Sequence, residues 1–213
     1  MTASSAAMRA SLTHRDWVDA AIEIMVDSSV EHVRIESLAR DLGVSKGSFY
    51  WHFRNRDELL SAVLDRWLNE ATIEITDRIL RQEADAAARL LTFLRLPMRS
   101  RRAIKAADLE LAILGWARRS RMAEDAVAAV DRLRLEHYQA TFQALGFSET
   151  EAVSRAHLAY AFTRYISQRR DLGVSARLQI AAQTHGALIE RARPKAAQAQ
   201  ASAAEHRATG RES

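Results

Sequence analysis

Apolar residues recur every three or four positions along nearly the whole chain, which is the spacing of one face of an α-helix. Trp17, Ala21 and Ile24 begin the pattern, and Leu178, Ala181 and Leu188 are among its last members. Only two prolines and seven glycines interrupt the 213 residues, too few for a β-rich chain with many tight turns. Apolar residues make up 48% of the chain, enough to bury a core. The sequence therefore predicts an all-α fold of about nine helices.

Local signals place several helix ends. Thr13 with Asp16 has the pattern of a capping box, and the run from Ser148 to Glu151 is a second N-terminal signal. Gly43 stands where a helix needs a left-handed C-terminal residue. Asn55 is expected to open a long fourth helix, and Ser45 and Ser175 are expected to cap two others. Three short helices and this long one thus fill residues 13 to about 81.

The segment around Gly43 has the layout of a helix-turn-helix, the motif that places a short helix in the DNA major groove. Val44, Phe49 and Phe53 can pack that helix on its own domain. Local charge also fits DNA, because four basic residues within 40–56 face a single acid, although residues 1–56 are neutral overall. The residues left to face outwards are Ser45, Lys46, Gly47, Ser48, Tyr50, Trp51 and His52.

The run SLARDLGVSKGSFYWHFRNRDELLSAVLDRW resembles the DNA-binding domain of the TetR family of transcriptional regulators, and the resemblance covers residues 13–68. It implies that Lys46, Gly47 and Ser48 contact bases. The chain departs from the family at Ser29, where glycine is usual, and at Val33 and Arg34, where threonine is usual. The resemblance implies contacts to the DNA backbone by Arg34, Ser37, Tyr50, Trp51, His52 and Arg56.

For the rest of the chain, the resemblance implies an effector-binding and dimerisation domain over residues 69–193, between a flexible arm (1–12) and a flexible tail (194–213). The last two helices are expected to form the dimer interface through Leu158, Phe162, Tyr165, Leu178, Ala182, His185 and Leu188. The alternative is that these apolar stripes bury against their own subunit. An effector pocket for an apolar or aromatic molecule is expected among Trp116, His137, Tyr138, Phe142, His157, Tyr160 and Arg164.

Two basic clusters, over residues 99–105 and 118–121, admit three interpretations. Solvated helix ends are the ordinary one, and contacts to flanking DNA or to an acidic effector are the others.

Other classes of protein find little support. The chain has no cysteine, no Glu-x-x-His pair, no phosphate-binding glycine loop and no nucleophile elbow, so an enzyme on a helical bundle is disfavoured and no cofactor or metal is implied. No apolar run is long enough to span a membrane. We therefore expect a cytoplasmic homodimer, nucleoid-associated when it binds a palindromic operator on double-stranded DNA. A repressor released by an unknown small-molecule effector is the first expectation, and an activator or an effector-assisted DNA binder is the alternative.

Overall fold

A computed structural model describes residues 12–98 and 100–190, and these residues contain helices and no strand. The all-α prediction is therefore confirmed. Two short 3₁₀ turns, at Val30–His32 and Leu96–Met98, join neighbouring helices. None of the helices in these two ranges is long and apolar enough to cross a membrane. The expected tail lies outside the described residues, as does the expected arm except for residue 12. The α-helices are α1 (His14–Asp27), α2 (Ile35–Asp41), α3 (Lys46–Phe49), α4 (Arg56–Leu68), α5 (Glu74–Gln82), α6 (Ala86–Arg95), α7 (Arg101–Ala117), α8 (Arg121–Ala144), α9 (Glu149–Gln168) and α10 (Val174–Ile189).

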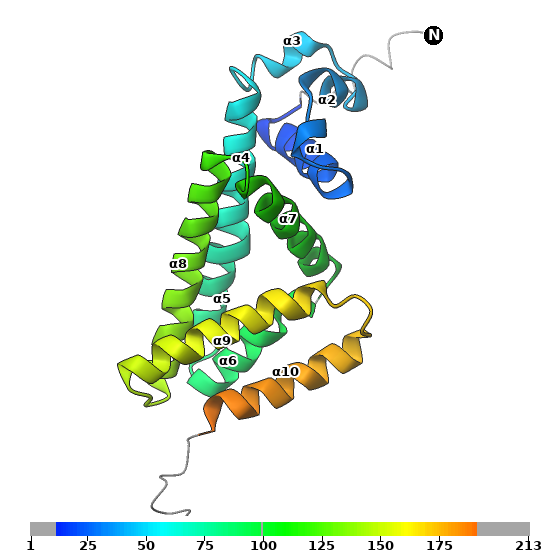
Figure 1. The fold of residues 1–213 in the computed structure, drawn as a ribbon. Coiled ribbons are helices and arrows are strands. Elements are labelled where there is room, and N and C mark those ends of the chain that lie inside the picture. Colours follow the sequence, from blue (N-terminus) through cyan, green and yellow to red (C-terminus); the bar gives the residue numbers. More distant parts are fainter. Residues whose placement is uncertain (1–11, 99, 191–213) are drawn as a thin grey trace, which may run out of the picture.

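Helices α1 to α3 gather at one end of the molecule, and α4 runs from them down beside α8 (Figure 1). Helix α7 crosses between the two ends, and it packs on both α1 and α8. At the far end, α9, α6 and α10 lie against one another. The end that holds α1 to α3 and the larger helical body are thus joined by two elements, α4 and α7.

The predicted helix starts depend on side-chain caps, and most of them are present. In α1 the Thr13 backbone N–H donates to the Asp16 carboxylate at 2.6 Å, and the Asp16 N–H donates back to the Thr13 hydroxyl at 3.3 Å. The same reciprocal pair joins Ser148 and Glu151 at the start of α9. The prediction for α10 was wrong, because Gly173 and not Ser175 occupies its N-cap position. Ser45 occupies the predicted N-cap position of α3, but its side chain makes no capping hydrogen bond there.

Gly43 ends α2 in the manner predicted from the sequence. Its φ of 69° lies in the left-handed region that favours glycine. The N–H of Val44 donates to the carbonyl of Ala39 at 2.9 Å, and the N–H of Gly43 donates to that of Arg40 at 3.0 Å. These two bonds form a Schellman motif, which turns the chain sharply from α2 toward α3.

The sequence predicts one long fourth helix, but the structure interrupts its regular α-helical bonding. A π-helical segment, Asn69–Ile73, separates α4 from α5, and the N–H of Glu74 reaches back five residues to the carbonyl of Asn69. A π turn inserts one residue into the helical register, so the apolar stripe rotates at this point.

Buried side chains form two apolar cores, and the boundary between them does not fall at residue 68. The first core contains the interior of α1 to α4, but Leu109, Ile113 and Trp116 of α7 and Val130 of α8 also belong to it. The second core joins α5, α6, α9 and α10 to the C-terminal half of α8. The predicted domains were divided by sequence position, at 68/69. The buried residues group differently, because the inward side of α7 packs with the N-terminal helices.

Candidate nucleic-acid interface

Aromatic side chains hold α3 on its domain. Phe49 is fully buried, and its ring meets Trp17 edge-on with centroids 5.3 Å apart. Phe53, which is 2% exposed, stacks on Phe49 at 5.4 Å. Val44 is half-buried against the same core. These are the three residues that the sequence assigned to the packed side, so that part of the prediction is confirmed.

The opposite side of α3 and the turn that follows it are largely open to solvent, and we call this surface, over residues 45–52, the reading face. Lys46 and Gly47 are exposed, Tyr50 is 52% exposed and Trp51 is 88% exposed. Indole and phenol rings combine an apolar body with a polar group, so two of them exposed side by side are suited to a wet interface. The remaining members of the reading face are Ser45, Ser48 and His52, of which Ser45 is exposed and the other two are half-buried.

Helix α2 contributes an acid that the sequence analysis did not single out. The Lys46 amine lies 2.5 Å from a carboxylate oxygen of Glu36. The hydrogen bond from Lys46 lowers the pKa of Glu36, and the same bond raises the pKa of Lys46. Arg34 is exposed just before α2, and Ser37 is half-buried within it. The predicted contacts of Arg34 and Ser37 with the DNA backbone remain predictions.

Arg56 makes contacts within the protein that the sequence did not predict. The phosphate contact that the resemblance implies stays a prediction, and the residue is half-buried. Its Nε donates to the carbonyl of Val33 at 2.6 Å, and one Nη donates to the carbonyl of Val30 at 2.5 Å. Both carbonyls lie in or beside the short 3₁₀ turn before α2, so Arg56 ties the start of α4 to that turn.

The expected dimer residues divide into two groups. Leu158 and Tyr165, on the outer face of α9, are 62% and 54% exposed, and Ala182 is exposed on α10. Leu188 instead packs in the second core, and the His185 ring lies 2.9 Å from the carbonyl of Ala87 within the same chain. Those two residues follow the alternative interpretation, burial against their own subunit. Phe162 and Leu178 are half-buried beside the second core.

The expected effector residues do not line one pocket. Trp116 lies in the first core, Phe142 is fully buried in the second, and His157 is exposed with its ring against the carbonyl of Val153. His137 is half-buried, and burial lowers its pKa. Helical spacing identified the inward-facing members of this set, but it cannot tell a filled core from a cavity.

Tyr138, Tyr160 and Arg164 do come together, and they do so around charged residues that the sequence analysis missed. Tyr138 donates or accepts a hydrogen bond with Thr163 at 3.2 Å, and burial raises its pKa to about 12. The other two join a group that we call the polar layer, which consists of Glu110 of α7, Asp131 and Arg134 of α8, and Tyr160 and Arg164 of α9.

Ion pairs bind the polar layer together. Arg134 donates to both oxygens of Glu110 at 2.9 and 2.8 Å, and Arg164 lies 2.5 Å from Asp131 and 3.4 Å from Glu110. The Tyr160 hydroxyl donates to Asp131 at 2.7 Å. Burial alone would lower the pKa of Arg134, but the facing carboxylate of Glu110 reverses this and raises it. The sequence held one signal, because Arg134 stands four residues from the inward-facing Val130 and from Tyr138.

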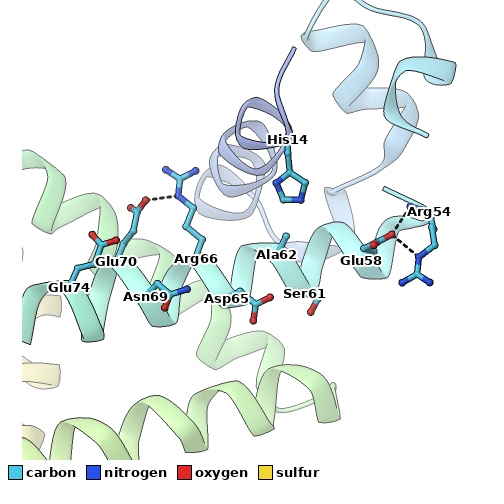
Figure 2. Close-up of a pocket in the computed structure, with 10 residues that line it drawn as sticks. All are labelled: His14, Arg54, Glu58, Ser61, Ala62, Asp65, Arg66, Asn69, Glu70 and Glu74. Carbon is cyan, nitrogen blue, oxygen red and sulfur yellow. Dashed lines mark hydrogen bonds and ion pairs between the residues drawn. The ribbon is translucent and has the colours of Figure 1, made fainter. Parts of the chain in front are cut away.

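A surface cleft of about 630 Å³ lies along α4 beside the start of α1 (Figure 2). Its walls are polar and carry more acids than bases. Arg66 bonds to Glu70 at 3.0 Å within it, and Arg54 bonds to Glu58 at 3.2 Å. None of its residues was predicted as an effector contact, and the excess of acid suits neither DNA phosphates nor an apolar effector. The lining residues are His14, Arg54, Glu58, Ser61, Ala62, Asp65, Arg66, Asn69, Glu70 and Glu74.

Three described members of the basic clusters pair with acids of the same chain. Lys105 of α7 pairs with Glu23 of α1 at 3.0 Å, and Arg119 pairs with Glu31 at 2.6 Å. Arg121 pairs with two acids of its own helix. Residue 99 lies outside the described residues, as do the side chains of residues 101 and 102. Lys105 and Arg119 thus hold α7 against α1 and the 3₁₀ turn that follows α1.

Comparison with known proteins identifies the N-terminal part of the chain. Residues 18–63 match the family model described as bacterial regulatory proteins, tetR family. The HTH-type transcriptional regulator SrpR of Pseudomonas putida is 39% identical over 62 residues, which is 29% of this chain and 29% of that protein. The match thus spans less than a third of that relative.

Solved structures extend the likeness to the fold. A transcriptional regulator from Rhodococcus sp. Rha1 superposes with a TM-score of 0.68 over 84% of this chain and 96% of its own, at 17% identity. FadR from Bacillus subtilis, solved with stearoyl-CoA, gives 0.62 over 85% of this chain and all of its own, at 13% identity. At such identities the likeness shows the fold alone. All three proteins are described as transcriptional regulators.

Proposed function

We propose that this protein is a dimeric transcriptional regulator that reads a palindromic operator and is released from it by a small molecule, because residues 18–63 match the model of the TetR family of regulators. The observation that carries the proposal is the reading face. Lys46 lies on a short helix whose other side is locked by Phe49, and Tyr50 and Trp51 stand exposed in the turn directly after it. A rigid helix with a cation, hydroxyls and bare backbone at its tip is suited to the major groove.

Dimerisation supplies the second half of the contact. One short helix makes few bonds to DNA, so a second copy is needed for affinity and for a symmetric site. The outer faces of α9 and α10 are the proposed interface, through Leu158, Tyr165 and Ala182. Exposed small residues such as Ala182 allow helices of two copies to approach closely. The two reading faces would then engage half-sites about 34–36 Å apart.

Release requires that the effector and DNA bind antagonistically. A ligand that favours one arrangement of α4 and α7 over another shifts the separation of the two reading faces, and linkage makes the effect reciprocal. FadR, a structural relative, was solved with stearoyl-CoA. Its likeness to this chain supports a ligand-responsive body, and the identity of the effector stays open to experiment.

The experiment is selection of bound duplexes from a random pool by the purified full chain at a stated salt concentration. We expect a palindrome, and Lys46→Ala should weaken its binding at least about 10-fold. Lys105→Ala is the matched control, because Lys105 is as exposed as Lys46 and is likewise paired with one glutamate. If no sequence is enriched, or if the two lysine variants bind equally, the proposed function is wrong.

A further inference from the structure

The polar layer lies between the two apolar cores. On α8, Arg134 is one turn from Val130 of the first core and one turn from Tyr138 of the second. Its guanidinium stands 5.9 Å from the ring of Trp67 in the first core and 5.9 Å from the ring of Tyr160 in the second. Arg134 therefore contacts both bodies of the molecule at their junction.

The same arginine also holds the π segment. Its Nε donates to the hydroxyl of Thr72 at 3.2 Å, and one Nη donates to the carbonyl of Ala71 at 3.3 Å. Thr72 is 1% exposed. A π turn can be shortened to an ordinary α turn by moving one residue out of register, so it is the point at which a long helix changes its twist or bend most readily. Arg134 binds the helix at that point.

The layer is largely withdrawn from water. Its two arginines and two carboxylates are balanced in charge, and their side chains are 16% to 31% exposed, so each loses part of its hydration, which the ion pairs must offset. Polar networks of this kind hold one arrangement when every member is satisfied and change when one partner moves. Three helices, α7, α8 and α9, supply its members, and the π segment that Arg134 holds adjoins α4, which leads to the reading face.

We propose that the Arg134-centred polar layer is the relay between the helical body and the reading face, acting through the grip of Arg134 on Thr72 and Ala71 in the π segment. A displacement of α9 moves Tyr160 and Arg164, which repositions Arg134 and lets the π segment alter its register. Helix α4, and with it the reading face, then turns. Arg134 is a positioning residue in this scheme, and the scheme rests on the proposed function only in that the turning end carries the DNA contacts.

The test perturbs the α9 side and observes the π segment by hydrogen–deuterium exchange of the full chain without DNA. Tyr160→Phe keeps the ring but removes the hydroxyl bonded to Asp131 and near Arg134. We expect exchange in the peptide 67–76 to rise about 3- to 10-fold, the size of coupling found within one network. In a Thr72→Val background, where the side-chain part of the grip is absent, the rise should fall below half.

Thr76→Val is the matched control. Thr76 is also a buried threonine, at 3% exposure, and lies four residues further on, in α5. Among the bonds described it makes no contact with the polar layer. That background should preserve the full rise. Arg164→Lys is a second perturbation from α9, in case Tyr160→Phe folds poorly. The relay is wrong if neither change alters peptide 67–76, or if Thr72→Val and Thr76→Val behave alike.

A second measurement separates this proposal from the proposed function. The affinity for the selected duplex should change with Tyr160→Phe in the otherwise native chain and change less in the Thr72→Val background. A chain that binds no DNA would overturn the proposed function, and the exchange experiment would still decide whether the relay exists.

Discussion

Lys46 of the reading helix and Glu36 of the preceding helix form an ion pair 2.5 Å long, on the surface that we propose for DNA. Binding a phosphate or a base acceptor through Lys46 competes with this pair, and it also brings the Glu36 carboxylate close to a polyanion. Glu36 therefore opposes binding to any duplex and is tolerated best where a base offers it a donor.

We expect Glu36→Gln to tighten binding to arbitrary DNA by up to about 5-fold, the range of an exposed ion pair, and to reduce the ratio of specific to non-specific affinity. Competition titrations with the selected palindrome and an unrelated duplex measure both quantities. Glu124→Gln, which removes the exposed acid paired with Arg121 on α8, should leave the ratio unchanged. Equal ratios for the two variants would show that Glu36 has no part in discrimination.

Gly47 tests whether DNA approaches the backbone of α3. A methyl group placed there would meet only the Ser45 hydroxyl, at an ordinary 3.6 Å, so Gly47→Ala should keep or raise the stability by up to about 1 kcal/mol. The affinity for the selected duplex should nevertheless fall at least about 10-fold, since the methyl group would stand between backbone and bases. Gly115→Ala on α7, also in open space, is the control. Unchanged affinity would place Gly47 away from the groove.

Arg56 offers a choice between a structural and a DNA-binding role. Because its guanidinium donates to two backbone carbonyls, Arg56→Met should lower the free energy of unfolding by about 2–3 kcal/mol in urea titrations. Arg54→Met, which removes an exposed arginine of the same turn, should cost far less. If Arg56→Met is as stable as the native chain yet loses DNA affinity, Arg56 acts mainly through the phosphate contact that the family resemblance implies.

The proposed dimer interface predicts a change of assembly. Leu158→Glu places a charge on the outer face of α9 and should shift the protein from dimer to monomer in sedimentation equilibrium, with weaker binding to the palindrome. Leu111→Glu adds the same charge to an exposed leucine of α7, at 41% exposure, and should leave the assembly unchanged. A dimer that survives Leu158→Glu uses another surface.

Acid should weaken the start of α1 in a defined way. The hydrogen bonds from Thr13 hold the pKa of Asp16 below its ordinary value of 3.8. A carboxyl whose pKa is lower in the folded chain contributes stability above its unfolded value and loses that contribution as the pH falls through the folded value. The difference in melting temperature between the native chain and Asp16→Asn should therefore be constant near neutral pH and shrink below about pH 4. A difference that persists at pH 2–3 would exclude the carboxylate as its cause.

Features decided within a few residues were predictable from the sequence. Gly43 and the Thr13–Asp16 pair specify their turn and cap through bonds to near neighbours, so their positions in the chain are sufficient evidence. Phe49 and Phe53 were placed inward by spacing on one short helix. The family resemblance added the identity of the reading face, which spacing by itself could not supply.

What the sequence did not reveal depends on partners far along the chain. Arg56 looks like any basic residue at a helix start until the carbonyls of Val30 and Val33 are seen beside it. Arg134 bonds to Glu110 and Thr72, which lie 24 and 62 residues away. The π turn has no local signal either, because the residues around it form an ordinary α-helix equally well. Only the assembled fold shows why an arginine occupies an inward position.

The extension of the first core into α7 and α8 has a consequence for exchanging parts between regulators. A cut after residue 68 would strip Leu109, Ile113 and Trp116 from the surface that they cover, and would sever the pairs Lys105–Glu23 and Arg119–Glu31. A chimera built at that cut would contain helices α1 to α4 with an exposed apolar surface and would be prone to aggregate. A chimera that takes α7 together with α1 to α4 keeps this apolar surface covered. The unit that can be exchanged between regulators is therefore discontinuous in sequence.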